Sequence, residues 1–173
     1  INLITGGSDP AGVLLKLMPI LGEADLGIPV HGLIGSSYQD RMRLEDAISS
    51  YSSELCLTNY NIDEVLYGDL TICTFGVTVY ELIFLGLPII TLGHAESNAL
   101  GSKRLAERYH INQDLGLLSD LDESEFIKKI RDAIKEKHQD MFMNVIHGKS
   151  FLDGKGAERC AGEINKYDSC KVN

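Results

Sequence analysis

Short apolar runs rich in β-branched residues alternate along the chain with segments whose apolar positions recur every three to four residues. The apolar runs have the length and composition of buried strands, which predicts strands at residues 2–5, 29–34, 54–58, 70–74 and 89–92. The intervening segments have the helical period, which predicts helices at about residues 10–22, 40–50, 62–68, 78–85 and 97–109. The chain therefore consists of repeated βα units.

This alternation predicts an α/β fold, a Rossmann-like three-layer α/β/α domain with a parallel sheet. Strands that are apolar on both faces need helices on both faces, and crossovers between parallel strands are right-handed. Such sheets bind ligands at the carboxyl ends of their strands. Residues 1–173 show no internal repeat, no low-complexity segment and no long linker, so we expect a single domain.

Two more helices are predicted in the last third of the chain. Residues 122–140 are amphipathic, their charged positions form a solvated face, and Asp122 with Glu125 resembles a capping box. Gly154 and Gly156 mark a loop before a last helix at about residues 157–166. These features are folding signals without functional content.

The segment INLITGGSDPAG, residues 1–12, combines a strand, a glycine turn and the start of a helix. Gly6 and Gly7 permit a tight turn, Ser8 or Asp9 can cap the helix, and Pro10 suits its first turn. The free backbone N–H groups of such a turn are a common phosphate site. Many βα turns have this composition for geometry alone, so both interpretations stay open.

A second turn of this kind follows the strand at residues 70–74. Phe75 and Gly76 form the turn, and Thr78 is available to cap the helix that follows. One helical turn later lies Glu81, the charged residue of the run 71–93. Its carboxylate is either an ordinary surface group or an acceptor for a pair of sugar hydroxyls.

Composition and charge exclude several partner classes. The net charge of −9 and the absence of a basic cluster argue against nucleic acid and anionic membrane surfaces. The four cysteines, Cys56, Cys73, Cys160 and Cys170, lack zinc or redox-motif spacing, which favours a reduced, cytoplasmic setting. No signal peptide is visible, and the apolar run at residues 82–92 is too short to span a bilayer.

Three motifs in register, GGSDP, GDLTICTFGVTVYELIFLGLPII and FLDGKGAER, resemble the C-terminal domain of the UDP-sugar hydrolase family of pseudaminic acid biosynthesis. This family has the two-domain GT-B fold, which also occurs in the N-acetylglucosaminyltransferase that makes the peptidoglycan lipid precursor. The resemblance covers nearly the whole chain. It implies that this domain binds the nucleotide half of a UDP-sugar. It also implies that an N-terminal domain of the same protein is absent here, and a sequence that starts without Met leads to the same expectation.

The resemblance also implies roles for particular positions. Glu81 matches the acid that holds the ribose hydroxyls, and Asn59 and Tyr60 lie where uracil is met. Asn61 beside them is either part of that contact or only the cap of the short helix. Two turns match the diphosphate-facing segments of the family, namely Gly7, Ser8 and Asp9, and Phe75, Gly76, Val77 and Thr78.

The segment after Gly93 departs from the family, whose members often carry an Asp-Asn-Gln type of sequence that touches sugar or phosphates. Here the positions are Glu96, Ser97 and Asn98, so the identity of the sugar is open. His94 beside them is a contact candidate, because the pKa of an unperturbed histidine lies near neutrality.

No catalytic arrangement is visible in the chain itself. It has no Ser/His/Asp set, no HExxH motif and no paired carboxylates, and it predicts neither a metal nor a cofactor. In the hydrolase family the catalytic histidine comes from the N-terminal domain. We therefore expect the nucleotide-binding half of a UDP-sugar hydrolase that releases a deoxy amino sugar for nonulosonic acid or surface polysaccharide biosynthesis. The alternatives are the sugar-donor domain of a GT-B glycosyltransferase or a non-catalytic nucleotide-binding domain.

Overall fold

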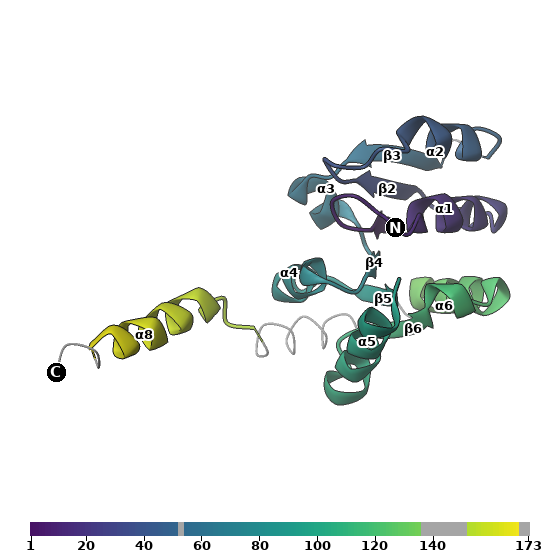
Figure 1. Cartoon of the computed structure of the whole chain (residues 1–173). Coiled ribbons are helices and arrows are strands. Elements are labelled where there is room, and N and C mark those ends of the chain that lie inside the picture. Colours follow the sequence, from purple (N-terminus) through teal and green to yellow (C-terminus); the bar gives the residue numbers. More distant parts are fainter. Residues whose placement is uncertain (52–53, 136–151, 170–173) are drawn as a thin grey trace.

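A computed structural model describes residues 1–51, 54–135 and 152–169, and its centre is a six-stranded sheet (Figure 1). All strand pairs are parallel, in the order β3-β2-β1-β4-β5-β6. The strands are β1 (Asn2–Ile4), β2 (Val30–Ile34), β3 (Leu55–Asn59), β4 (Thr71–Thr74), β5 (Ile89–Gly93) and β6 (Gln113–Leu117). The parallel sheet that the sequence predicts is confirmed.

Helices cover both faces of the sheet and produce the expected three layers (Figure 1). One face packs against α1 (Val13–Glu23), α2 (Arg41–Ile48) and α6 (Glu123–Lys135). The other packs against α3 (Ile62–Tyr67), α4 (Val77–Leu85) and α5 (Glu96–Tyr109). A 3₁₀ turn, Leu118–Asp120, precedes α6, and α8 (Gly156–Ser169) extends away from the sheet on the α4 side.

The hydrophobic core consists of two clusters, one on each side of the sheet. Neighbouring residues of a central strand alternate between them: Leu3 belongs to the α1 side and Ile4 to the α4 side, and both are buried. Ile72 and Cys73 of β4 alternate in the same way. Burial on both faces explains why the central strands are continuous apolar runs.

The cysteines of the described residues form no disulfide. Cys73 is buried, which raises the pKa of its thiol to about 12, whereas Cys56 is half-buried and Cys160 is exposed. Cys170 lies outside the described residues, as do positions 136–140 of the helix expected at 122–140. No helix in the described part of the chain is long and apolar enough to cross a membrane.

Strand β6 is missing from the sequence prediction. It is a five-residue edge strand, Gln113–Leu117, without a β-branched residue, and Gly116 has a φ of 78°. Its pairing with β5 is interrupted by a register shift between Thr91 and Gly93. A short, irregular edge strand of this composition has little β-propensity, so tertiary pairing decides its structure.

Two helix starts also differ from the prediction. Helix α1 begins at Val13, not at Pro10, because the loop continues to Gly12, which takes a left-handed φ of 64° as the N-cap. Helix α4 begins at Val77 with Gly76 as the N-cap, so Thr78 lies within the first turn and does not cap the helix. At α6 the expected cap is confirmed, since the Glu125 N–H donates to Asp122 Oδ1 at 2.8 Å.

The strand order locates the point where the winding of the sheet reverses. From β1 the chain proceeds to β2 and β3 on one side, and from β4 it proceeds to β5 and β6 on the other. Open α/β sheets bind ligands outside the carboxyl ends of the strands at such a switch point. The two glycine-containing turns singled out in the sequence follow β1 and β4, the two strands that meet there.

Candidate functional site

The turn after β1 presents part of its backbone to solvent. Gly7 and Ser8 are exposed, and Gly6 has a φ of 86°, a conformation that favours glycine. The Ser37 N–H donates to the Gly7 carbonyl oxygen at 3.0 Å, which joins this turn to the loop after β2. Gly35 of that loop lies so close that an added Cβ would meet the Gly7 carbonyl oxygen at 2.4 Å. The turn is therefore held firmly by its neighbour.

Asp9 is the buried residue of the same turn, and its side chain accepts hydrogen bonds from the first amides of α1. Its Oδ1 accepts from the Val13 N–H and its Oδ2 from the Leu14 N–H, each at 2.9 Å. Asp9 thus accepts from the first amides of α1 as the sequence suggests, although the N-cap residue is Gly12. The same contacts occupy two of the amides at the start of α1 that a phosphate would need.

The electrostatic setting of Asp9 links the loops after β1 and β5. Burial raises the pKa of the Asp9 carboxyl above its usual value, although the two amide hydrogen bonds oppose this shift. The charge of His94 also lowers this pKa, while that of Asp40 raises it. The exposed His94 thus lies close enough to Asp9 for their charges to interact.

The turn after β4 leaves the start of α4 open. The Val79 N–H donates to the Gly76 carbonyl oxygen at 3.2 Å. The N–H groups of Val77 and Thr78 have no hydrogen-bond partner among the residues that the structure describes. The N-terminus of this nine-residue helix therefore offers free donors and the positive end of the helix dipole.

Phe75 in this turn is fixed on several sides. Its N–H donates to the Leu92 carbonyl oxygen at 2.8 Å, and its ring meets the Tyr80 ring edge-on with centroids 6.2 Å apart. The ring also packs on Gly101, where an added Cβ would lie 2.4 Å from Phe75 Cε1. Asn98 Nδ2 donates to the Phe75 carbonyl oxygen at 2.9 Å. Asn98 thus holds the turn, whereas Glu96 and Ser97 are exposed at the start of α5.

A pocket of about 520 Å³ begins at the open end of α4 and joins several of the predicted residues. Val77, Glu81 and Phe84 line it from α4, and Tyr60 lines it from the corner after β3. Burial and the charge of Glu81 raise the pKa of the Tyr60 hydroxyl, which shows that the two side chains are near each other. The pocket therefore brings aromatic rings and the Glu81 carboxylate beside the open start of α4.

The C-terminal segment forms the opposite wall of this pocket. Leu152, Asp153, Gly154, Gly156 and Arg159 line it. Asp153 accepts from Arg159 Nη1 at 2.5 Å and from the Lys155 N–H at 3.0 Å, and these bonds lower the pKa of its carboxyl to about 2. The FLDGKGAER motif was recognised in the sequence, but its position in the pocket was not predicted.

Tyr80 and Phe84 are further pocket residues that the sequence analysis did not name. Their spacing from Val77 and Glu81 places all four on one face of α4, which a helical projection would have shown. A second hollow, of about 610 Å³, lies between α1 and α6 and contains none of the predicted residues.

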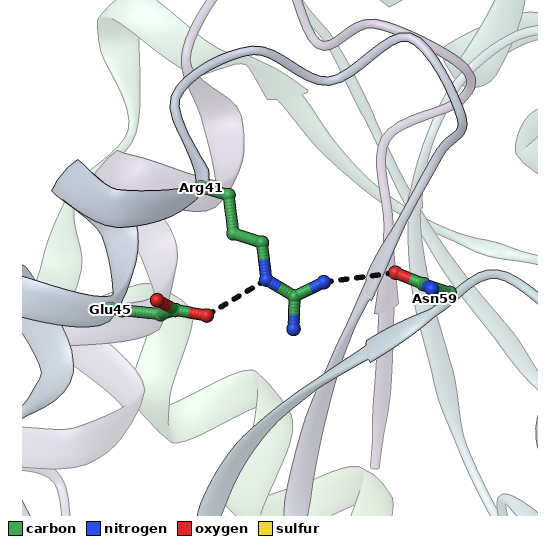
Figure 2. Close-up of polar contacts among 3 residues, drawn as sticks. All are labelled: Arg41, Glu45 and Asn59. Carbon is green, nitrogen blue, oxygen red and sulfur yellow. Dashed lines mark hydrogen bonds and ion pairs between the residues drawn. The ribbon is translucent and has the colours of Figure 1, made fainter.

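Asn59 ends β3 and contacts helix α2 (Figure 2). Its Oδ1 accepts from Arg41 Nη1 at 2.9 Å, and Arg41 Nε donates to Glu45 Oε1 at 2.8 Å. Asn61 caps α3, because its side chain accepts from the Asp63 N–H at 3.1 Å. Of the two interpretations left open for Asn61, the capping role is therefore confirmed. No cluster of His, Cys, Asp and Glu in the described ranges could hold a metal ion.

Comparison with known proteins gives one partial similarity in sequence and several similarities in fold. No protein-family model matches the chain. An uncharacterized protein of Methanocaldococcus jannaschii, MJ1062, is 30% identical over 92 residues, which is 50% of this chain and 19% of that protein. Acinetobacter baumannii MurG has a similar structure, with a TM-score of 0.69 and 15% identity, over 96% of this chain and 52% of its own.

Two further solved structures show the same likeness. Os79 from O. sativa, solved in complex with UDP, has a TM-score of 0.63 and 14% identity over 94% of this chain and 39% of its own. CalG4, the calicheamicin glycosyltransferase, has a TM-score of 0.62 and 13% identity over 99% of this chain and 43% of its own.

The fold is that of a Rossmann-like domain of the GT-B type. At these identities the structural likeness defines the fold alone. It supports the GT-B half-domain expected from the sequence and does not support the narrower UDP-sugar hydrolase family. The chain spans about half or less of the length of each structure it resembles.

Proposed function

We propose that this domain binds a UDP-sugar at the carboxyl edge of its sheet, as the sugar-donor half of a GT-B glycosyltransferase. The observation that carries the proposal is the open N-terminus of α4 beside the pocket of Tyr60 and Glu81. A nucleoside diphosphate needs donors for its phosphates, acceptors for its ribose hydroxyls and an apolar or aromatic surface for its base. These groups occur there side by side.

The diphosphate binds in this proposal at the N–H groups of Val77 and Thr78, across from the exposed Gly7–Ser8 turn. Backbone amides at a helix N-terminus hold an anion without a metal ion. Gly76 leaves the approach clear, because an added Cβ there would meet no atom within 4 Å. The Asp9 carboxylate already accepts from the first two amides of α1, so in this proposal the phosphates contact the amides of α4 instead.

In this proposal the ribose and the base lie in the pocket, beyond the first turn of α4. The Glu81 carboxylate accepts from the two ribose hydroxyls, and the Asn59–Tyr60 corner contacts uracil. The exposed residues at the start of the β5–α5 segment, His94, Glu96 and Ser97, face the remaining side and contact the sugar. Asn98 acts through the turn of Phe75 and not by direct contact.

Two of the proteins with a similar fold favour the glycosyltransferase over the hydrolase. One neighbour is a calicheamicin glycosyltransferase and another was solved in complex with UDP. Hydrolysis of a UDP-sugar for surface polysaccharide biosynthesis is the second candidate. It is favoured by the FLDGKGAER motif, five of whose residues between Leu152 and Arg159 line the Glu81 pocket.

The proposal places the catalytic groups and the acceptor site in a second domain. The chain covers 52% of the MurG structure and 43% of the CalG4 structure, which supports a missing half. The chain alone should therefore bind UDP but turn over no UDP-sugar.

Titration calorimetry of the chain with UDP tests the binding site. We expect a saturable isotherm that needs no divalent cation, and UDP binding no tighter than that of inorganic phosphate would refute the proposal. Protein that contains both halves is then incubated with UDP-sugars. Release of UDP only with an acceptor supports transfer, release without acceptor supports hydrolysis, and no release supports a non-catalytic binding domain.

A further inference from the structure

Residues 152–159, which we call the strap, contact the domain through two residues. Leu152 is half-buried and packs against the core cluster on the α4 side of the sheet. At Gly154, which has a φ of 71°, an added Cβ would lie 3.3 Å from Phe84 Cε2, so the strap backbone lies against the Phe84 ring. Glycine suits both this conformation and this close approach. The strap is thus seated on the face of α4 that also carries Glu81.

Asp153 gives the strap its shape. It stands between the two residues that make these contacts, and its own partners lie further along the chain. Its Oδ1 accepts from the Lys155 N–H at 3.0 Å, and its Oδ2 accepts from Arg159 Nη1 at 2.5 Å in the first turn of α8. One carboxylate therefore holds both ends of the strap in a fixed arrangement.

The attachment of the strap is shallow. The side chains of Arg159 and Asp153 are 62% and 53% exposed, and an ion pair this exposed stabilises a fold little. Residues 156–166 of α8 are all exposed, and Figure 1 shows this helix extended away from the sheet. Segments with few buried contacts open locally at a lower free energy than the core does. The strap can therefore leave α4 while the sheet stays folded.

A ligand in the Glu81 pocket would contact the strap as well as α4. The pocket has a volume of about 520 Å³, with Val77, Glu81 and Phe84 on the α4 wall and five residues of the strap on the opposite wall. When the strap leaves α4, the ligand loses the contacts of that wall. The ligand thus has a higher affinity for the closed position, which is the condition for shifting a conformational equilibrium.

We infer that the strap is a closing element that seats on the ligand of the Glu81 pocket, with Asp153 as the positioning residue that keeps it in the closed shape. The inference rests on the proposed function and adds a conformational response to it. Coupling of this kind is reciprocal, so substitutions that open the strap weaken the ligand by the same factor by which the ligand holds the strap closed.

Hydrogen exchange of the chain with and without saturating UDP measures the closure directly. We expect UDP to slow exchange of the backbone amides of residues 154–160 by about fivefold or more, the low end of coupling between two sites. The change should exceed any change in α6, which lies on the other face of the sheet.

Two glycine variants test the contact with α4. Gly154→Ala places a methyl group against Phe84 and puts alanine at a φ of 71°, so the strap should open and UDP affinity should fall by about fivefold or more. Its thermal stability should stay near wild type, because the strap adds little to the core. Gly162→Ala is the matched control, since an added Cβ on this residue of α8 meets nothing within 4 Å.

Asp153→Asn tests the positioning role. An Asn side chain has one oxygen for the two donors, so the closed shape should be less populated and UDP should bind more weakly. Removal of a negative charge acting through charge alone would tighten the binding of an anion, so the two effects have opposite signs. Glu158→Gln is the charge control, because Glu158 is exposed on α8 and does not line the pocket.

The outcomes separate this inference from the proposed function. If the wild-type chain binds no UDP, the proposed function fails and the inference fails with it. If UDP binds but exchange in residues 154–160 does not respond, or Gly154→Ala binds UDP as Gly162→Ala does, the inference is overturned and the nucleotide site remains. If circular dichroism shows that Gly154→Ala does not fold, wild-type exchange and the UDP affinity of Asp153→Asn decide.

Discussion

The side-chain amide of Asn98 donates a hydrogen bond to the carbonyl oxygen of Phe75 at 2.9 Å and so ties helix α5 to the turn that opens α4. These residues lie 23 positions apart in sequence. The turn carries the amides of Val77 and Thr78, which have no partner in the described part of the chain, and its conformation decides where they point. Asn98, a residue that the resemblance implies as a sugar or phosphate contact, therefore holds this turn.

Asn98→Ala should weaken UDP binding by loosening this turn. Removal of the bond costs about 0.5–1.5 kcal/mol of folding free energy, typical of a neutral hydrogen bond. Asn98→Asp should be more damaging, because a carboxylate cannot donate to the carbonyl and repels it. Arg104→Ala is the matched control, since Arg104 is exposed on the same helix and has no part in the proposed site. Calorimetry and thermal unfolding measure both effects, and an Asn98→Ala protein with normal stability and normal UDP affinity would contradict the positioning role.

Asp9→Asn should strengthen UDP binding while weakening the fold. The Asp9 carboxylate accepts from two backbone amides, whereas an Asn side chain has one oxygen for them, so a cap loss of about 1 kcal/mol is expected. The substitution also removes a negative charge beside the proposed diphosphate, which should tighten UDP binding several-fold at low salt. Weaker UDP binding by the variant would contradict this and would mean that the Asp9 carboxylate favours UDP binding.

The raised pKa of Asp9 predicts a pH dependence with a definite sign. Burial raises this pKa above 3.8 in the folded state, so the folded chain holds the proton more tightly than the unfolded chain. The protonated Asp9 carboxyl therefore adds to the free energy of unfolding in full below the pKa of the unfolded chain, and this contribution is lost as pH rises through the pKa of the folded chain. Urea unfolding of wild type and Asp9→Asn at about pH 4 and about pH 7 measures it. The wild type should lose stability relative to the variant as pH rises, and a constant difference would argue against the shift.

The sequence predicts the fold well because burial leaves a strong signal. Strands β1, β4 and β5 are apolar on both faces, and the amphipathic period of α1 and α6 matches the cores they enter. Strand β6 carries no such signal, because an edge strand with one glycine and a register shift depends on its partner β5. The start of α1 was misplaced because Pro10 suits a first helical turn, while the chain continues to a left-handed Gly12.

The candidate site is less accessible from the sequence than the fold. The sequence does predict that one edge of the sheet collects Gly7, Tyr60 and Glu81. Each lies after the carboxyl end of a strand or near the start of the helix that follows it, so the topology of the parallel sheet brings them to that edge. The partners of Asp9 and Asn98 depend on side-chain directions that spacing does not encode. Arg41 gives no signal either, since an arginine at a helix start is usually a solvated group. Its contact with Asn59 arises only when β2 and β3 pair.

Two glycines near the site should respond differently to substitution by alanine. At Gly93 an added Cβ would lie 2.2 Å from the Ala99 backbone nitrogen, so α5 would have to move. Gly93→Ala should lower the free energy of unfolding by about 1–3 kcal/mol, the range for overpacking. At Gly76 an added Cβ meets nothing within 4 Å, and a φ of −175° is extended backbone that any residue adopts.

Gly76→Ala is therefore the matched variant for binding. Its thermal stability should stay near wild type, whereas its UDP affinity should fall several-fold, because the methyl group enters the space in front of the α4 amides. Unchanged UDP affinity in Gly76→Ala would place the diphosphate elsewhere.

Glu81→Gln tests whether the carboxylate in the pocket is a ligand for ribose or an ordinary helix surface group. If it accepts hydrogen bonds from both ribose hydroxyls, the substitution should weaken UDP binding by about 1–3 kcal/mol, the range for losing a charged acceptor. Glu81 is exposed, so the thermal stability of the unliganded variant should change little. Glu107→Gln, an exposed residue of α5 outside the pocket, controls for loss of one negative charge.

The 2′-deoxy form of UDP separates a direct ribose contact from a general effect of charge. Loss of the 2′-hydroxyl should weaken binding to the wild type more than to Glu81→Gln, because the variant has already lost most of that interaction. A general charge effect would weaken the binding of both ligands equally, since they carry the same diphosphate. Equal penalties in wild type and variant would therefore make Glu81 a surface residue, and the ribose would then have to be held by another group along the pocket.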